Sequence, residues 1–362
     1  MIYLANFIII YFYSFLVRIY SRNDNEFRRL LGLLLSAHII LFRILSYPFD
    51  YADTPNYADA YIDISNYSFY EVAFSFHEYT VWGQGYAIFN WFLSRVSTDV
   101  MFFFIVSGIM IVGIPMWFYN KKSYTLLLTV SLYLLYPMLY LMSFAVLRQH
   151  LAAVIFIVAL YNIANYKISI PLSLIAVLFH TSALVFLPFF LWRKIDFSKM
   201  NSVKLFLLLC LGVLVLKMGV NMVVGYVSNF LSTDRNADFS EQAEGTNIMP
   251  VLILGLMVFM IFKERLLVKC KRIDYEIAVF IIYGFLISIF GIGLSGAGRL
   301  SMYFIYFVPV VVSFPFHYSD RVRRPNSLLY AFVLILIFLR QMYYMYSSWV
   351  MDFDYKFFWN FI

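Results

Sequence analysis

The sequence predicts an all-α protein of the polytopic membrane class, and three observations lead to this prediction. The chain has 362 residues, of which 63% are hydrophobic, 21% aromatic and only 13% charged. Its mean hydropathy is +0.80. Apolar runs long enough to cross a bilayer core of about 30 Å recur along the chain. Soluble domains are nearer half apolar and a quarter charged, so water-soluble enzymes, nucleic-acid-binding modules and secreted disulfide scaffolds are all but excluded.

Ten segments have the length and hydropathy of membrane-spanning helices. They cover residues 1–20, 30–47, 100–119, 123–142, 145–165, 203–230, 248–262, 273–292, 300–317 and 327–346. The first begins without a cationic stretch or a small-residue cleavage site, so we expect a retained span rather than a signal peptide. No low-complexity linker or clear repeat interrupts the series, so we expect a single transmembrane domain over residues 1–362.

Two further apolar segments do not fit a simple crossing. Residues 85–96 are too few, whereas residues 168–192 are many and include Pro171, His180 and Pro188. We expect both segments to be re-entrant or broken helices. A bilayer tolerates such elements only where protein or a water-filled cavity satisfies the freed backbone groups.

The basic residues predict the topology, because Lys and Arg accumulate in cytoplasmic loops. Nineteen of the 27 form six groups. These are Arg18/Arg22/Arg28/Arg29, Lys121/Lys122, Lys167, Arg193/Lys194/Lys199/Lys204, Lys263/Arg265/Lys269/Lys271/Arg272 and Arg321/Arg323/Arg324. All six groups lie inside if segments 85–96 and 168–192 each enter and leave on the same side. Both chain ends then lie outside.

The acidic residues support this assignment. Residues 48–80 contain six acids and no Lys or Arg, and residues 231–246 contain four acids and one Arg. We therefore place an amphipathic loop, residues 48–99, and a second loop, residues 231–246, on the outer side.

Four arginines gather toward the outer ends of predicted spans: Arg43, Arg148, Arg299 and Arg340. A charge near the bilayer centre costs at least about 2.5 to 3.5 kcal/mol, and the spans contain few acids to neutralise it. An anionic ligand such as a lipid-linked phosphate or pyrophosphate resolves this, because Arg binds phosphate oxygens as a two-pronged donor. The alternative for each arginine is snorkelling or a buried ion pair.

Two other positions carry candidate chemistry. His180 lies in a Phe-His-Thr-Ser-Ala run within segment 168–192, where the imidazole can act as a general base or bind phosphate. The alternative is a hydrogen-bonded packing residue. Asp53, Tyr57 and Tyr61 follow a four-residue spacing that places them on one helix face, a surface suited to a sugar. For the tyrosines the alternative is an aromatic belt at the membrane interface.

Several short motifs occur in a fixed order along residues 50–305. They are Asp53-x-x-x-Tyr57-x-x-x-Tyr61, Gly85-Tyr86 with Phe89 and Phe92, Leu147-Arg148-Gln149-x-Leu151-Ala152, His180-Thr181-Ser182-Ala183-Leu184 and Gly298-Arg299-Leu300-x-x-Tyr303-Phe304. Each motif is weak alone, but the ordered set resembles the EpsG-like branch of the Wzy polysaccharide polymerases.

The resemblance implies a GT-C-like glycosyltransferase at the outer face of the bacterial cytoplasmic membrane. Such enzymes move a growing glycan from undecaprenyl pyrophosphate onto another lipid-linked repeat unit. The implied partners are the lipid-linked donor and acceptor glycans, membrane lipid and a Wzz-type chain-length regulator, and no nucleic acid. The implied pyrophosphate ligands are Arg148, Gln149, Arg299, Arg43 and Arg340, and the implied sugar ligands are Tyr57, Tyr61, Gln84 and Tyr86.

The catalytic base stays open at this stage. The family pattern has an acid just before Gly-Tyr, where this chain has Gln84. Asp53, His180 and Glu78 are the candidates. The cysteines Cys210 and Cys270 lack metal-ligand spacing, and the spans lack a paired-acid motif. We therefore expect a metal-independent reaction without a cofactor, with Arg148 and Arg299 on the pyrophosphate.

Other activities fit the same composition. An O-antigen ligase or a membrane O-acyltransferase would also use membrane-embedded His or Arg. A flippase for lipid-linked oligosaccharides would equally contain broken helices and buried charge.

Overall fold

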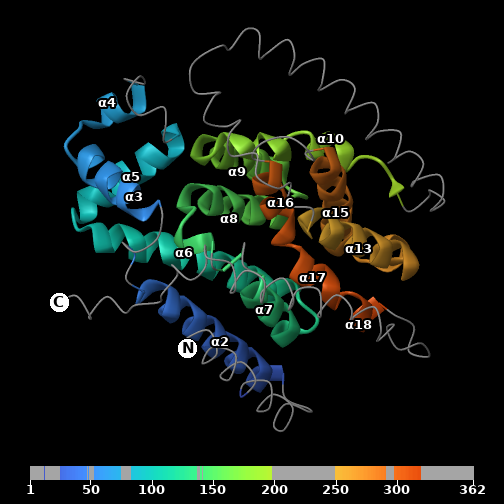
Figure 1. Cartoon of the computed structure of the whole chain (residues 1–362). Coiled ribbons are helices and arrows are strands. Elements are labelled where there is room, and N and C mark those ends of the chain that lie inside the picture. The colour runs from blue at the N-terminus through green and yellow to red at the C-terminus, as the bar shows by residue number, and fades with distance from the viewer. Residues whose placement is uncertain are drawn as a thin grey trace. The chain divides into compact units, whose positions relative to one another are not determined.

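The computed structural model of the chain contains two helical units (Figure 1). It describes residues 12, 25–46, 48, 53–74, 83–136, 139–140, 142–197, 249–290 and 297–318. One unit comprises residues 1–186 and 326–362, and the other comprises residues 187–325. Every element in the described residues is a helix, which confirms the all-α class for that part of the chain. The predicted spans 203–230 and 327–346 and the loop 231–246 lie outside the described residues, as does the span 1–20 except for Phe12.

One helix of the described part is long and apolar enough to cross a bilayer, α6 (Val100–Lys122). The other apolar helical stretches found there have 10–17 residues. Ten full crossings are therefore not confirmed. A hydropathy average depends only on which side chains a segment contains. It therefore cannot detect a helix end within an apolar segment, and it predicts spans longer than the helices that form.

The centre of the first unit is a helical hairpin. α8 (Leu147–Tyr161) and α9 (Tyr166–Phe179) are joined by residues 162–165, and the Asn165 side chain accepts a hydrogen bond from the Lys167 amide at 3.1 Å. Twelve of the fifteen residues of α8 are buried, as expected for a central helix. Because the connection is short, the helices are antiparallel, and the beginning of α8 lies at the same end as the end of α9.

A second pair packs beside this hairpin. α2 (Asn25–Ile44) lies along α6, and the Asn120 amide of α6 donates to Ser36 Oγ of α2 at 2.8 Å. α7 (Leu126–Leu135) follows α6. The predicted span 123–142 is wrong at its end, because Tyr136 has extended backbone angles. The next residue is Pro137, and proline disfavours a helical conformation at the residue before it.

Three short helices form the described part of loop 48–99: α3 (Thr54–Ser65), α4 (Phe69–Phe74) and α5 (Gln84–Val96). Both α3 and α4 pack on α5 (Figure 1). Arg95 at the end of α5 donates to the Ser65 carbonyl at 2.7 Å and to the Tyr67 carbonyl at 3.1 Å. A helix of 13 residues is about 20 Å long, so α5 is shorter than a crossing, in keeping with its predicted class.

Segment 168–192 is broken, as predicted. α9 ends at Phe179, His180 is extended with φ −154° and ψ 121°, and a 3₁₀ helix, η3 (Thr181–Phe186), follows. His180, Thr181 and Ser182 therefore lie at the break, directly after the end of α9. Re-entry on the same side of a membrane stays a prediction.

The second unit contains α10, α13 and a set of helices around α15. Their bounds are α10 (Phe189–Trp192), α13 (Met249–Lys263), α14 (Leu266–Lys269), α15 (Arg272–Phe290), α16 (Ala297–Ile305), α17 (Val308–Ser313) and α18 (Pro315–Tyr318). The segment 300–317, predicted as a single span, is therefore not one continuous helix: it is divided into three helices, and Pro309 and Pro315 lie at the starts of the second and third. A buried ion pair between Arg193 and Glu276, with Nε and Oε2 2.9 Å apart, links the end of α10 to α15.

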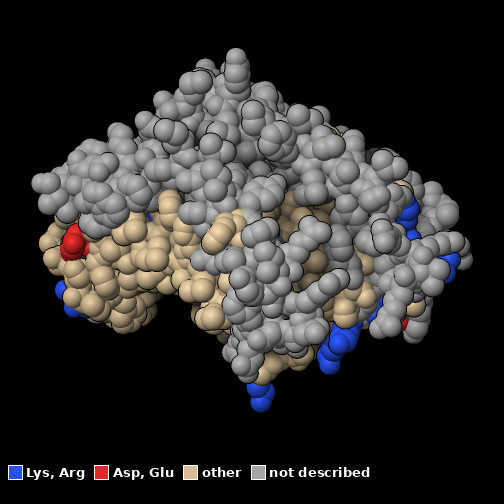
Figure 2. All heavy atoms as spheres, turned by 90° about the horizontal axis from the view of Figure 1, so that it is seen from below, with Lys and Arg blue, Asp and Glu red and all other residues tan. Residues whose placement is uncertain are grey.

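The described surface carries few charges. Viewed from below, most of it belongs to neither acidic nor basic residues (Figure 2). Exposed apolar side chains include Leu33 of α2, Ile109 of α6 and Leu174 of α9. Exposed apolar surface on several helices suits contact with lipid tails.

Candidate functional site

Arg148 lies in the first turn of the central helix α8. The hairpin places His180, the residue directly after α9, at the same end of the first unit. Two motifs that are 32 residues apart in sequence thus share one end of the fold.

α3 brings a phenol to Arg148. Tyr57 is 3% exposed, and its hydroxyl is within electrostatic and hydrogen-bonding reach of the Arg148 guanidinium. Asp53, at the N-cap of α3, is exposed and lies one turn before Tyr57. Burial raises the pKa of the Tyr57 hydroxyl, Arg148 lowers it and Asp53 raises it, with burial the largest of these effects. Tyr57 therefore stays protonated at neutral pH and can donate a hydrogen bond.

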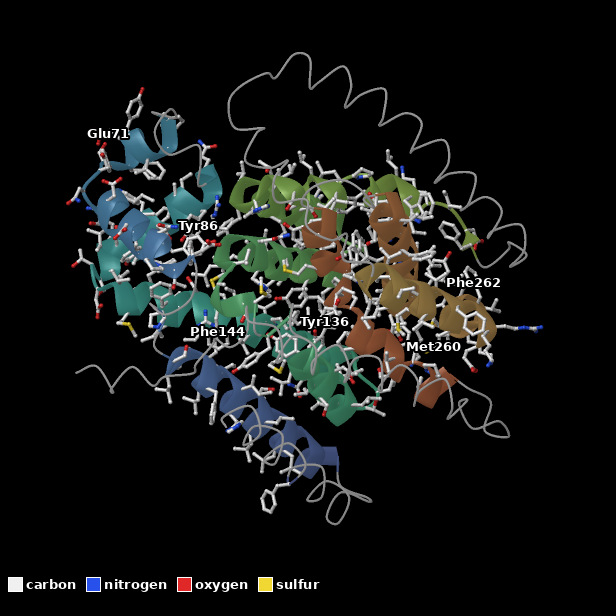
Figure 3. The ribbon with its side chains drawn as sticks, viewed as in Figure 1. Glu71, Tyr86, Tyr136, Phe144, Met260 and Phe262 are labelled. Carbon is white, nitrogen blue, oxygen red and sulfur yellow. The ribbon has the colours of Figure 1, made fainter. Side chains whose placement is uncertain are left out.

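α5 adds a second phenol. Tyr86, which is labelled in Figure 3, is fully buried. Its ring meets the Tyr57 ring edge-on, with centroids 5.9 Å apart. Its hydroxyl is within electrostatic range of Arg148. Three of the motifs recognised in the sequence therefore meet, because α3, α5 and α8 each contribute one side chain to the same place.

Two glycines let α5 approach the end of α9. Gly83 has φ +82°, and a Cβ there would lie 2.9 Å from the Leu178 carbonyl oxygen. A Cβ on Gly85 would lie 2.8 Å from Leu178 Cβ and 3.1 Å from Phe179 Cδ2. A side chain at either position would push the two helices apart. The first turn of α5 therefore packs directly against the residues that precede His180.

The hydrogen bonds of His180 define its tautomer. Its Nδ1 accepts from the Ser182 amide at 3.3 Å and lies 2.6 Å from Ser182 Oγ. Because a backbone N–H can only donate, Nδ1 must carry the lone pair. The neutral ring then has its proton on Nε2, and that edge acts as a hydrogen-bond donor.

Two predicted sugar ligands have packing partners instead. Tyr61 is fully buried, its hydroxyl donates to the Ser97 carbonyl at 2.5 Å, and its ring stacks on Phe103 with centroids 5.1 Å apart. The Gln84 amide donates to the Ala73 carbonyl at 2.5 Å and ties α5 to α4. Both side chains hold the loop 48–99 together, so we leave them out of the site.

The other predicted pyrophosphate ligands lie on several elements. Gln149 and Arg43 are 1% and 2% exposed. Arg299 lies in α16, in the second unit, and its side chain is outside the description. Arg340 and the candidate base Glu78 lie outside the described residues.

Sequence reasoning missed Asn90. This residue is fully buried one turn after Tyr86 on α5, and its amide faces the Tyr86 hydroxyl. A polar residue four positions after Tyr86 in an apolar run was the available signal, because that spacing places both on one helix face.

The groups brought together are a guanidinium, two phenols and, at the edges, a carboxylate and an imidazole. Within the described ranges, no three His, Cys, Asp or Glu side chains form a group that could hold a metal ion. A guanidinium flanked by neutral donors is suited to binding a phosphate or a developing negative charge on oxygen.

Comparison with known proteins gives one match. A model of the family described as EpsG family covers residues 33–361. No curated protein and no solved structure matches the chain. The family match includes all the motifs quoted above.

Proposed function

Because the chain belongs to the EpsG family, whose members are membrane proteins of polysaccharide biosynthesis, we propose that it is a Wzy-type polysaccharide polymerase. In this proposal it transfers a glycan from an undecaprenyl pyrophosphate donor to a lipid-linked acceptor repeat unit, without a metal, at the outer face of the cytoplasmic membrane. The observation that carries the proposal is the meeting of Arg148, Tyr57 and Tyr86, drawn from three motifs, beside the carboxylate of Asp53.

The proposed reaction is a displacement at the anomeric carbon of the donor sugar. An acceptor hydroxyl oxygen forms the new bond to that carbon, and the bond from the carbon to the pyrophosphate oxygen breaks. The bonding electron pair leaves with the pyrophosphate, where Arg148 stabilises the charge and the Tyr57 hydroxyl donates a hydrogen bond. The proton of the acceptor hydroxyl passes to a base.

The proposal assigns the base to Asp53 rather than to His180. Asp53 is exposed, so an acceptor hydroxyl can reach it, and it is next to Tyr57. The Ser182 amide donates to His180 Nδ1, so that lone pair is already engaged and is less suited to accept the acceptor proton. His180 is then a hydrogen-bonding ligand, and Asp53 accepts the proton.

The test is polymerisation by the purified full-length protein given lipid-linked repeat units in EDTA. We expect a ladder of products. The Asp53→Asn variant should lose the ladder, whereas His180→Gln, which can still donate from a similar position, should retain a substantial part of it.

Several outcomes would contradict this proposal. Inhibition by EDTA that magnesium reverses would remove the metal-free mechanism. Transfer of one repeat unit without a ladder would indicate a ligase, and lipid-linked units that cross a vesicle membrane unchanged would indicate a flippase. Loss of activity in His180→Gln together with an active Asp53→Asn would return the base to His180.

The outer location of the site has its own test. A cysteine replacing Asp59 on the exposed side of α3 should react with an impermeant maleimide in intact spheroplasts. A cysteine replacing Lys121, at the end of α6, should react only after the cells are opened. The reverse labelling would invert the topology and place Asp53 and Tyr57 in the cytoplasm.

A further inference from the structure

Arg43 has partners that differ from those of a ligand-binding arginine. It lies in the last turn of α2 and is 2% exposed. Its guanidinium donates to the Ser143 carbonyl at 3.2 Å and lies 4.2 Å from the centre of the Phe144 ring. Figure 3 shows Phe144 close to this end of α2. Both partners belong to η2 (Met142–Phe144), 100 residues away in sequence.

α6 makes room for this side chain. A Cβ on Gly108 would lie 3.3 Å from Arg43 Cγ and 3.7 Å from one of its guanidinium nitrogens. The guanidinium therefore passes across a glycine of α6 to reach η2. It is enclosed by protein on the side of α6 and by the Phe144 ring on another.

The segment that Arg43 holds leads directly into α8. After α7 ends, residues 136–146 contain η2 as their only described helical turn. The Ser143 hydroxyl donates to the Tyr140 carbonyl at 2.5 Å, and the amides of Ala145 and Val146 donate to the Met142 carbonyl at 3.1 and 2.9 Å. Arg148 follows two residues later, so the position of η2 determines where α8 begins.

Arg43 also reaches the first turn of α8 itself. His150, which is fully buried in that turn, lies within electrostatic range of the Arg43 guanidinium. The amide of His150 donates to the Val146 carbonyl at 3.3 Å. Arg43 therefore acts on both the connection and the turn that carries Arg148.

We propose that Arg43 is a positioning residue, which fixes η2 and thereby holds Arg148 against Tyr57, and that it does not itself bind pyrophosphate. This inference rests on the proposed function for the part that concerns catalysis. Its physical basis is that a charge-assisted hydrogen bond and a cation–π contact in a buried site restrict a segment in which the three-residue η2 is the only helical turn that the structure describes. A displacement of about 1 Å at a reacting group can cost on the order of 10²-fold in rate.

The experiment compares Arg43→Met, Arg43→Lys, Phe144→Leu and the Arg43→Met/Phe144→Leu pair in the purified full-length protein. Amide hydrogen exchange of residues 142–150 is measured together with turnover of lipid-linked repeat units. We expect faster exchange in this segment for Arg43→Met and for Phe144→Leu. We expect each single variant to lose about tenfold or more in turnover. The double variant should lose little more than the less active of the two single variants, because both substitutions act on one contact.

Arg43→Lys separates positioning from ligand binding. A lysine ammonium keeps the charge and can still donate to the Ser143 carbonyl, but it lacks the planar face that lies over the Phe144 ring. We therefore expect Arg43→Lys to retain more turnover than Arg43→Met and less than wild type. Arg148→Lys, by contrast, should lose turnover almost completely, because a lysine cannot replace the two-pronged guanidinium at that position. Unchanged exchange in Arg43→Met, additive losses in the pair, or loss of turnover in Arg43→Lys equal to that in Arg148→Lys would each overturn the inference.

Failure of the proposed function gives a different result. If the wild-type protein forms no polymer while exchange in residues 142–150 still responds to Arg43→Met and Phe144→Leu, the assignment of Arg43 to η2 stands and the polymerase proposal does not.

Discussion

Replacing Arg148 by lysine should abolish polymer formation, with a loss of turnover on the order of 10²- to 10³-fold. The substitution keeps the positive charge but removes the planar fork that can bind two pyrophosphate oxygens at once. It also moves the charge away from the Tyr57 hydroxyl, which in the wild-type protein is within hydrogen-bonding reach of the Arg148 guanidinium. The measurement is the rate of ladder formation by purified protein, with membrane accumulation and thermal stability recorded in parallel.

Arg95→Lys is the matched control for that experiment. Arg95 also donates from a guanidinium, but to the Ser65 and Tyr67 carbonyls, and it lies over the Trp91 ring with 4.8 Å to its centroid. Its replacement should alter the stability of the α3–α5 group and leave turnover near that of wild type. Wild-type turnover in Arg148→Lys would reduce Arg148 to a structural partner of Tyr57.

Gly85→Ala should remove most of the polymerase activity, even though the change adds a single methyl group. The new Cβ would lie 2.8 Å from Leu178 Cβ and 3.0 Å from the Leu178 carbonyl carbon, so α5 must move away from α9. Overpacking of this kind typically costs about 1–3 kcal/mol of stability. Because Tyr86 is the next residue, the movement also displaces its ring from Tyr57, and we expect a fall in turnover of about tenfold or more.

Gly113→Ala is the control for the glycine experiment. A Cβ at Gly113 of α6 would lie 3.6 Å from Ile40 Cδ1 and 3.9 Å from Ile109 Cγ2, which is ordinary van der Waals contact. Alanine is favoured over glycine in a helix by about 1 kcal/mol, so this variant should be at least as stable as wild type and equally active. Equal activity in Gly85→Ala would show that the approach of α5 to α9 does not position the site.

Much of the fold class and part of the site could be predicted from sequence. Composition predicted helices and a membrane environment, and the EpsG family match agrees with both the resemblance and the class. Segment 168–192 is broken as predicted, but the break comes at His180, whereas Pro171 lies inside α9. These features depend on local chemistry, namely on how much apolar surface a segment carries and on which backbone angles its residues accept.

The roles of individual polar residues were less predictable. The helical spacing of Asp53, Tyr57 and Tyr61 does place them on α3, yet Tyr57 meets Arg148 while the Tyr61 hydroxyl donates to Ser97. The spacing shows which residues share a helix face. One face can pack against two different neighbours, so one of its residues can contribute to the site while another only packs. Only the neighbours distinguish them.

The sequence by itself predicted an all-helical membrane protein that resembles the EpsG family, with arginines and a histidine that need polar surroundings. The tertiary structure decided which of those residues meet. It brought Arg148 to Tyr57 and Tyr86, gave Arg43 the Ser143 carbonyl as its partner, and divided the apolar segment 300–317 into three helices. The physical reason is that hydropathy is a property of each residue, whereas a hydrogen-bond partner and a helix end depend on which distant segment packs against that residue.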